Sequence, residues 1–186
     1  MTDVLALDIA TTTGWARGAV GTATPLCGSI RFCKPGASHS AIVGRAMQWA
    51  IDLTTTSKPD VVAIEALVPP LAMRGRTNVD HDLLAMLHGA IMGVLFLRGV
   101  YKVNRYPVQS IRAHFLNGIP YGKGEGKTVT VRKCRSLGWL ESTDDDAADA
   151  LACWSYQAAL IEPQHAIRIS PLFAKKFWAK CAESDS

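Results

Sequence analysis

Hydrophobic and polar positions divide the chain into short strands and longer helices. Residues 3–9, 14–20 and 26–32 are rich in apolar and β-branched residues and are separated by turns that contain glycine or proline, which predicts an antiparallel three-strand meander. The continuous apolar run at residues 61–65 is typical of a buried parallel strand, and residues 100–106 are expected to form a fifth strand.

Helical periodicity and end signals predict the remaining elements. Ser38 or Ser40 is expected to cap the first helix, Gly99 to end the second, and Pro107 to take the first position of the third. The glycine-rich residues 117–126 are expected to form a loop. The first helix would run to about residue 55, and the others would cover residues 78–97, 107–116, 127–136 and 144–160.

A meander joined to parallel crossovers predicts an α/β fold, with a central mixed five-stranded sheet and helices on both faces. The chain has 186 residues, of which 48% are hydrophobic, enough for one substantial core. We expect one domain at residues 1–162 and a basic, aromatic tail at residues 163–186. No secretory signal or membrane span is visible, so a cytoplasmic protein is expected. The five cysteines show no zinc-binding spacing.

Acidic residues stand where a metal site would need them. Asp8 and Glu65 each end a hydrophobic strand, and they could lie side by side if these strands are neighbours. Asp146 and Asp149 share one face of the last predicted helix. Four carboxylates so placed would repel one another unless cations bind, and oxygen ligands favour Mg²⁺, with Mn²⁺ able to substitute.

Each acid also has a purely structural explanation. An aspartate after a strand is often a turn residue, Glu65 could pair with an arginine of the next loop, and Thr143 with Asp146 resembles a capping box. Asp149 resists such an explanation because it lies nearly two turns into the helix. It is surrounded by alanines, which would let the helix approach the sheet closely. The set therefore favours two-ion phosphodiester chemistry.

Charge is distributed unevenly along the chain, whose formal net charge is +4. Residues 123–135 contain five basic residues and one acid, whereas residues 141–149 contain five acids and no base. The net charge alone identifies no partner. A basic segment beside an acidic cluster is nevertheless suited to a metal-dependent nuclease.

Three segments resemble the acidic motifs of RuvC-type Holliday junction resolvases, a branch of the ribonuclease H-like superfamily. They are residues 5–10 (LALDIA), residues 62–65 (VAIE) and, most specifically, residues 146–152 (DAADALA). Their order and spacing agree with the family, and the resemblance spans residues 3–160. It implies a ribonuclease H-like fold and a homodimeric, Mg²⁺-dependent endonuclease that nicks two strands of a four-way DNA junction symmetrically. The implied metal ligands are Asp8, Glu65, Asp146 and Asp149.

The leading hypothesis gives each residue a role. Water is activated between two ions, Asp8 bridges them, Glu65 holds one, and Asp146 and Asp149 hold the other. The resemblance places a lysine-bearing loop before the fourth helix, so Lys127, and secondarily Lys123, would neutralise the cleaved phosphate. An ordinary solvated loop is the alternative. The predicted DNA-binding residues are Arg74, Arg76, Lys123, Lys127 and Arg132.

One departure from the family concerns residues 67–76, which contain no aromatic residue. Bacterial members often carry an aromatic there that stacks on bases near the crossover, so Arg74 and Arg76 would instead grip phosphates or the junction centre. His81 and His88, on the long second helix, are expected at the surface or an interface. The Leu- and Met-rich stripe of that helix is either core or, by resemblance, part of a dimer contact.

Three other functions are compatible with parts of the sequence. A nuclease of the same fold could act on other branched DNA, RNA/DNA hybrids or structured RNA. Residues 8–14 (DIATTTG) are similar to the first phosphate loop of sugar kinases and actin, but the chain cannot hold the second domain such proteins need. A catalytically silent nucleic-acid-binding domain is disfavoured by the four acids. A resolvase would work in the cytoplasm of a bacterial cell or a phage-infected host.

Overall fold

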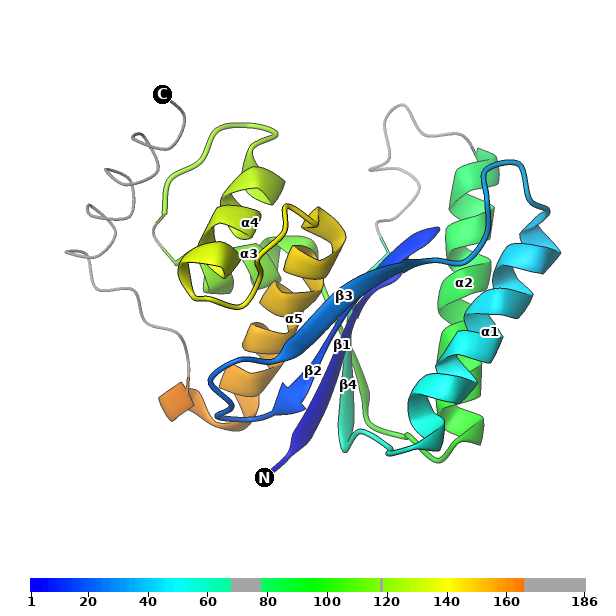
Figure 1. The fold of residues 1–186 in the computed structure, drawn as a ribbon, viewed down its shortest axis with the longest axis horizontal. Helices are drawn as coiled ribbons and strands as arrows, with labels where there is room; N and C mark the ends of the chain where they lie inside the picture. Colours follow the sequence, from blue (N-terminus) through cyan, green and yellow to red (C-terminus); the bar gives the residue numbers. More distant parts are fainter. Residues whose placement is uncertain (68–77, 118, 166–186) are drawn as a thin grey trace.

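One mixed sheet separates two layers of helices in the computed structural model, which describes residues 1–67, 78–117 and 119–165 (Figure 1). The strands are β1 (Asp3–Asp8), β2 (Thr12–Ala19), β3 (Leu26–Arg31), β4 (Val61–Glu65) and β5 (Val103–Tyr106). The helices are α1 (His39–Thr55), α2 (Asn78–Leu97), α3 (Val108–Leu116), α4 (Gly126–Ser136) and α5 (Asp145–Ile161), followed by the 3₁₀ turn η2 (Pro163–His165).

The strand order is β3-β2-β1-β4-β5. β1, β2 and β3 pair antiparallel, whereas β4 pairs parallel with both β1 and β5. Helices α1 and α2 cover one face, and α3, α4 and α5 lie on the other (Figure 1). The predicted α/β fold with a mixed five-stranded sheet is therefore confirmed.

Two hydrophobic cores form because side chains alternate across a strand. Val4 and Ala6 of β1 pack with α5 on one face, whereas Leu5 and Leu7 pack with α1 and α2 on the other. Both sets are completely buried. The central strands are thus apolar on both faces, which explains the continuous hydrophobic runs in the sequence.

β2 begins at a different residue from the one predicted, and the structure decides between two predicted caps of α1. β2 begins at Thr12, two residues early, because the Thr13 hydroxyl accepts from the Ala10 N–H at 3.2 Å and donates to the Ala10 carbonyl at 2.8 Å. The chain thereby reverses within a few residues. Of the two serines proposed to cap α1, it is Ser38 whose hydroxyl accepts from the Ala41 N–H at 3.3 Å.

β5 and α3 begin later than predicted. The backbone N–H groups of Gly99 and Val100 still donate to carbonyls of α2, so β5 starts only at Val103. Pro107 is the N-cap of α3 rather than its first helical residue, because its ψ of 140° is extended. Neither difference moves an acid of the predicted site.

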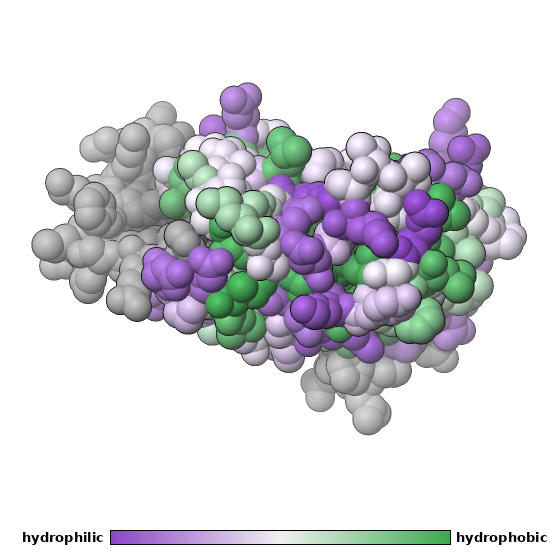
Figure 2. All heavy atoms as spheres, turned by 90° about the horizontal axis from the view of Figure 1, so that it is seen from below, coloured by the Kyte–Doolittle hydropathy of each residue, from purple (hydrophilic) through white to green (hydrophobic). Residues whose placement is uncertain are grey.

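The end of the molecule at which β1 begins has a mixed surface, with hydrophilic residues across its centre and hydrophobic patches beside them (Figure 2). Arg17 ties the start of β1 to the chain after α1 by donating to Asp3 at 2.6 Å and to the Ser57 hydroxyl at 2.7 Å. No helix in the described part of the chain combines the length and apolarity needed to cross a membrane. Nearly all of the predicted tail, residues 166–186, lies outside the described residues.

Candidate functional site

Asp8 and Glu65 end two neighbouring parallel strands. The register pairs Leu7 of β1 with Ile64 of β4, so the acids that follow lie at the same edge of the sheet. Residues two and four positions earlier on both strands belong to the core on the α5 side. Because side chains alternate along a strand, Asp8 and Glu65 also face that side.

Helix α5 brings Asp146 and Asp149 to the same edge. The approach depends on Gly14, which pairs with Asp8 in the β1–β2 register. A Cβ atom at Gly14 would lie 1.9 Å from the backbone carbonyl oxygen of Asp146, so only glycine allows α5 to begin there. The alanines on both sides of Asp149 are almost completely buried, in agreement with the expected close packing of this helix on the sheet.

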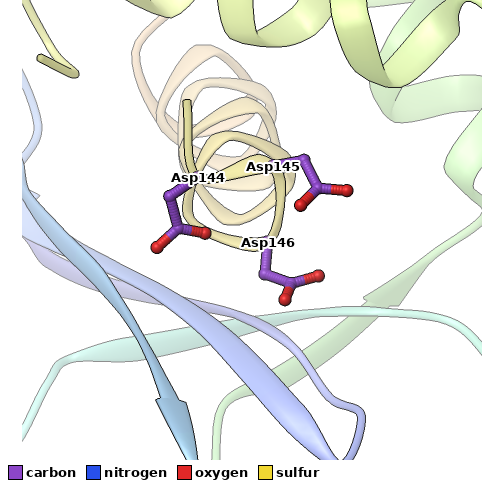
Figure 3. Close-up of side chains that lie close together, drawn as sticks. All are labelled: Asp144, Asp145 and Asp146. Atoms are coloured by element: carbon purple, nitrogen blue, oxygen red, sulfur yellow. The ribbon is translucent and has the colours of Figure 1, made fainter. Parts of the chain in front are cut away.

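Three successive acids begin α5, and their carboxylates fan out around its first turn (Figure 3). Asp144 is the N-cap, because its carboxylate accepts from the Ala147 N–H at 3.0 Å. The alternative of a Thr143 cap is therefore wrong, and Asp146 is not needed for capping. Among the described acids, histidines and cysteines, only Asp144, Asp145 and Asp146 form a trio with ligand atoms all within 4.8 Å. The four predicted ligands are spaced more widely than that.

A cavity of about 290 Å³ opens at this edge of the sheet. Its walls contain every residue predicted to be catalytic, namely Asp8, Glu65, Lys127, Asp146 and Asp149. Other walls come from α2 and α3, with Leu84, His88, Val108 and Arg112. The fold therefore brings together the acids of two strands and one helix with a lysine from a third region of the chain.

Burial and, after it, neighbouring charges raise the pKa values of the carboxylates in the cavity. Burial, followed by the charge of Asp149, raises the pKa of Asp8 to about 7. Burial, followed by the charges of Asp8 and Asp149, raises the pKa of Glu65 to about 8. Burial also raises the pKa of Asp149, although Arg112 and Lys127 oppose the shift. The negative charge is incompletely compensated, a condition that a bound cation would relieve.

Lys127, in the first turn of α4, contacts three acids of α5. Its Nζ lies 2.8 Å from Asp145, 3.6 Å from Asp146 and 3.8 Å from Asp149. Burial alone would lower the pKa of Lys127, but the hydrogen bond to Asp145 and the charge of Asp149 raise it well above its usual value. The ammonium group is therefore a permanent positive charge beside the acids.

Arg112 of α3 is a second cation at the cavity, and the sequence patterns do not reveal it. Its Nη2 lies 3.2 Å and 3.4 Å from the two carboxylate oxygens of Asp149, whose side chain is only 5% exposed. The Nε of Arg112 is buried without a hydrogen-bond partner among the described residues. No motif marks this arginine, because only the packing of α3 against α5 brings it to the site.

The expectation that His88 lies at the surface or an interface is wrong. Its imidazole is 4% exposed and lines the cavity, and it forms a hydrogen bond with the backbone of Ile9. Its Nδ1 is buried without a partner among the described residues. Burial lowers the pKa of His88 to about 4, so the ring is neutral. Helical spacing could have revealed this burial, because His88 shares a stripe with Leu84, Ile91 and Leu95.

The predicted DNA-binding residues do not all surround the cavity. Lys127 lines it, and Lys123 is exposed in the preceding loop. Arg132 lies five residues after Lys127 and therefore on a different side of α4. Arg74 and Arg76 lie outside the described residues.

Lys133 does not contribute to the basic surface suggested by the sequence. It is completely buried, and its ammonium group donates to the backbone carbonyl of Phe115. Burial lowers its pKa to about 8. The basic segment at residues 123–135 therefore offers one cation fewer to a polyanion than its composition indicates.

The chemistry of the cavity fits hard divalent cations. All four predicted ligands are carboxylates, and oxygen donors select Mg²⁺ or Mn²⁺ over softer metals. Cys153 lies near these acids, but burial raises its pKa well above the usual value, so it would remain a thiol. Two cationic side chains already balance part of the negative charge. The raised pKa values of Asp8 and Glu65 show that this balance is incomplete.

No family model matches the chain, and no curated protein matches its sequence. Solved structures do match. RuvC from Thermus thermophilus in complex with a Holliday junction substrate is similar with a TM-score of 0.68 and 19% identity, covering 91% of this chain and 100% of that one. Another Thermus thermophilus RuvC structure has a TM-score of 0.67 and 20% identity, covering 90% and 100%. The yeast mitochondrial Holliday junction resolvase Ydc2 has a TM-score of 0.60 and 12% identity, covering 95% and 84%.

These similarities establish the class of fold. The chain has the ribonuclease H-like fold of the RuvC structures. The match covers the whole length of both RuvC chains. The resemblance of the three acidic motifs to RuvC-type resolvases is therefore borne out at the level of the fold. At 12–20% identity, the function is a separate question.

Proposed function

We propose that this chain is a metal-dependent endonuclease of the RuvC type that resolves four-way DNA junctions by paired nicks. One observation carries the proposal. Four carboxylates from β1, β4 and α5 meet two cationic side chains in a single cavity, within the fold of the RuvC structures. This combination of charges suits a phosphodiester, whose cleavage needs bound cations and stabilisation of added negative charge.

Within this proposal, Asp8, Glu65, Asp146 and Asp149 would hold two Mg²⁺ ions, with Mn²⁺ able to substitute. When bound, such ions would supply activation of water and stabilisation of the leaving oxygen. Arg112 and Lys127 bind the oxygens of the scissile phosphate. Both are already directed at the cavity by their contacts with Asp149, at 3.2 Å and 3.8 Å, so little reorganisation is required when the phosphate enters.

A homodimer is part of the proposal because paired nicks need two cavities. The side of α2 that faces away from the sheet supports it. Gly89 and Gly93 are exposed there with open space beside them, and Met86, Phe96 and Leu97 are 46%, 63% and 83% exposed. Small residues between large apolar ones would allow two copies of α2 to pack closely.

Cleavage assays with different DNA structures test the function directly. Wild-type protein, Mg²⁺ and end-labelled four-way junction, duplex, flap and RNA/DNA hybrid substrates are incubated in parallel, and the nicks are mapped. We expect symmetric nicks in two opposing strands of the junction and little cleavage of duplex. Preferential cleavage of hybrid or flap would instead favour another nuclease of the same fold.

The matched variants are Asp149→Asn and Asp52→Asn. Asp149 is buried in the cavity, whereas Asp52 is exposed on α1, on the other face of the sheet. Asp149→Asn should reduce cleavage more than about 100-fold. Loss of a residue that only supports a metal ligand costs at most about that much, and loss of a ligand itself should cost more. Junction binding in EDTA should persist. Asp52→Asn should cleave normally. Full cleavage by folded Asp149→Asn protein would refute the assignment of the site.

A further inference from the structure

Tyr121 is an exposed aromatic residue beside the cavity, and the proposed chemistry does not use it. Its side chain is 46% exposed, and it precedes α4, the helix that carries Lys127. The other strongly exposed aromatic residues in the described chain are Phe96 and Tyr101. Their rings pack on each other with centroids 5.2 Å apart. Neither residue lines the cavity.

The position of the Tyr121 ring is defined by its neighbours. A Cβ atom built on Gly126 would lie 3.1 Å from Nη1 of Arg112 and 3.5 Å from Cε2 of Tyr121, so the ring and the guanidinium group flank the same point at the start of α4. The loop between them is closed by the Glu125 carboxylate, which accepts from the Gly122 N–H at 2.7 Å. The ring therefore stands near the Arg112 guanidinium, at the start of the helix that carries Lys127.

This arrangement combines two kinds of contact that single-stranded nucleic acids require. Cationic side chains bind the phosphates, and an aromatic face stacks on the base attached to the same backbone. A tyrosine offers an apolar ring for stacking, and its polar hydroxyl tolerates solvent when no base is bound. Arg112 is paired with Asp149 and is therefore committed to the cavity, which leaves the ring as the group available to a base.

We propose that Tyr121 stacks on an unpaired or splayed nucleobase next to the phosphate held by Arg112 and Lys127. The inference rests on the proposed nuclease function and adds to it a subsite for a base. It also supplies an aromatic contact in a chain whose residues 67–76 contain none. Stacking is tolerant of base identity, so the subsite selects an exposed base rather than a sequence.

The test uses fluorescent junctions, two Tyr121 variants and one control variant of the full chain. Nicks are first mapped with wild-type protein, and 2-aminopurine is then placed on either side of the nick. Binding is titrated in EDTA. Wild-type protein and Tyr121→Phe should change the 2-aminopurine fluorescence equally. Tyr121→Ala should abolish the change and weaken binding about tenfold, within the range for losing one base stack. Leu160→Ala, which removes another exposed apolar side chain, should behave like wild type.

Salt dependence separates stacking from phosphate binding. Lys123→Ala, in the same loop, should lower the slope of log affinity against log salt if that lysine contacts a phosphate. Tyr121→Ala should weaken binding at every salt concentration and leave the slope unchanged. Thermal unfolding of each variant confirms that it is folded.

The outcomes that overturn the inference are distinct from those that overturn the function. If wild-type protein nicks the junction but Tyr121→Ala binds it and changes the 2-aminopurine fluorescence as strongly as Leu160→Ala does, the base subsite is refuted and the nuclease stands. Equal losses in Tyr121→Phe and Tyr121→Ala would show that the hydroxyl rather than the ring acts, which also refutes stacking. A wild-type protein that neither binds nor nicks the junction overturns the proposed function and the inference together.

Discussion

Single residues in the cavity carry charges that oppose folding when no cation is bound. The pKa values of Asp8 and Glu65 are raised from 3.8 and 4.5 to about 7 and about 8. The folded protein therefore holds protons that the unfolded chain releases between about pH 4 and pH 8. Because the folded state binds more protons, stability falls as the pH rises through this range. Divalent cations that bind these carboxylates, as proposed, should reverse the loss.

Stabilisation by a metal ion at this site should depend on pH. Saturating Mg²⁺ should raise the melting temperature more at pH 8.5 than at pH 6, because at pH 6 protons occupy Asp8 and Glu65. A ligand at 100 times its dissociation constant stabilises by about 2.7 kcal/mol. For a chain of this size, each kcal/mol corresponds to about 2–4 °C. Thermal melts in EDTA and in Mg²⁺ at both pH values measure the effect.

The metal-dependent difference, rather than the melting temperature itself, is the informative quantity. His88 acts in the opposite direction, because burial lowers its pKa from 6.5 to about 4. The stability it contributes is present above pH 6.5 and is lost as the pH falls toward 4. Asp8→Asn should flatten the pH dependence in EDTA and reduce stabilisation by Mg²⁺. Equal stabilisation by Mg²⁺ at both pH values in wild-type protein would contradict this account.

At the scale of elements, the site depends on how closely α5 approaches the sheet. Two strands alone provide Asp8 and Glu65, but a cavity with four acids forms only when the helix begins against β2. Gly14 supplies the required space, since any Cβ there meets the Asp146 backbone at 1.9 Å. The alanines around Asp149 supply the rest of the space that this close approach needs. Small residues at this contact therefore place the carboxylates of the helix.

Gly14→Ala should displace the start of α5 and misplace Asp146. We expect a loss of about 1–3 kcal/mol in the free energy of unfolding, as for overpacking elsewhere. Cleavage should decrease more than tenfold, a loss consistent with misplacement by about 1 Å. Chemical denaturation and the junction assay measure the two effects.

Gly44→Ala is the matched control. Gly44 lies inside α1 with nothing within 4 Å of an added Cβ, so this change should stabilise the protein by about 0.5–1 kcal/mol and leave cleavage unchanged. Normal cleavage by Gly14→Ala would show that the contact between β2 and α5 does not position the site.

At the scale of the whole molecule, the two faces of the sheet have separate tasks. The α5 face holds the cavity, and the α1–α2 face offers an exposed apolar helix. His88 connects the faces, because it belongs to α2 but lines the cavity and bonds to the backbone after Asp8. A dimer formed through α2 would therefore use a helix that also lines the cavity.

Met86→Glu and Phe96→Glu should each convert the proposed homodimer into a monomer. Both side chains are exposed on α2, so the fold should be unaffected, and a carboxylate placed in an apolar interface is costly. Light scattering after gel filtration measures the oligomeric state. Nicks in the two strands of a junction should become uncoupled in time.

Leu160→Glu provides the control for these dimer variants. It introduces the same charge at a 53% exposed position on α5, and it should remain dimeric. A wild-type monomer that makes paired nicks would refute the dimer while leaving the cavity assignment intact.

The sequence by itself determined where the helices and strands lie and which acids meet at one edge of the sheet. Local signals suffice for these, because alternation and helical periodicity report which faces are buried, and runs such as residues 61–65 end where their strand ends. The residues predicted as catalytic, Asp8, Glu65, Lys127, Asp146 and Asp149, all line one cavity. Their neighbouring positions followed from two strand ends and the i, i+3 spacing on a helix.

Only the tertiary structure decided which other residues join those acids and which do not. Arg112 reaches the cavity because α3 packs beside α5, and Tyr121 comes near Arg112 at the start of α4; no local pattern encodes either approach. Lys133 looks like part of a basic surface but is buried, and His88 looks peripheral but faces the acids. The physical reason is that charge and hydropathy are properties of single residues, whereas burial and proximity arise from contacts between segments distant in the chain.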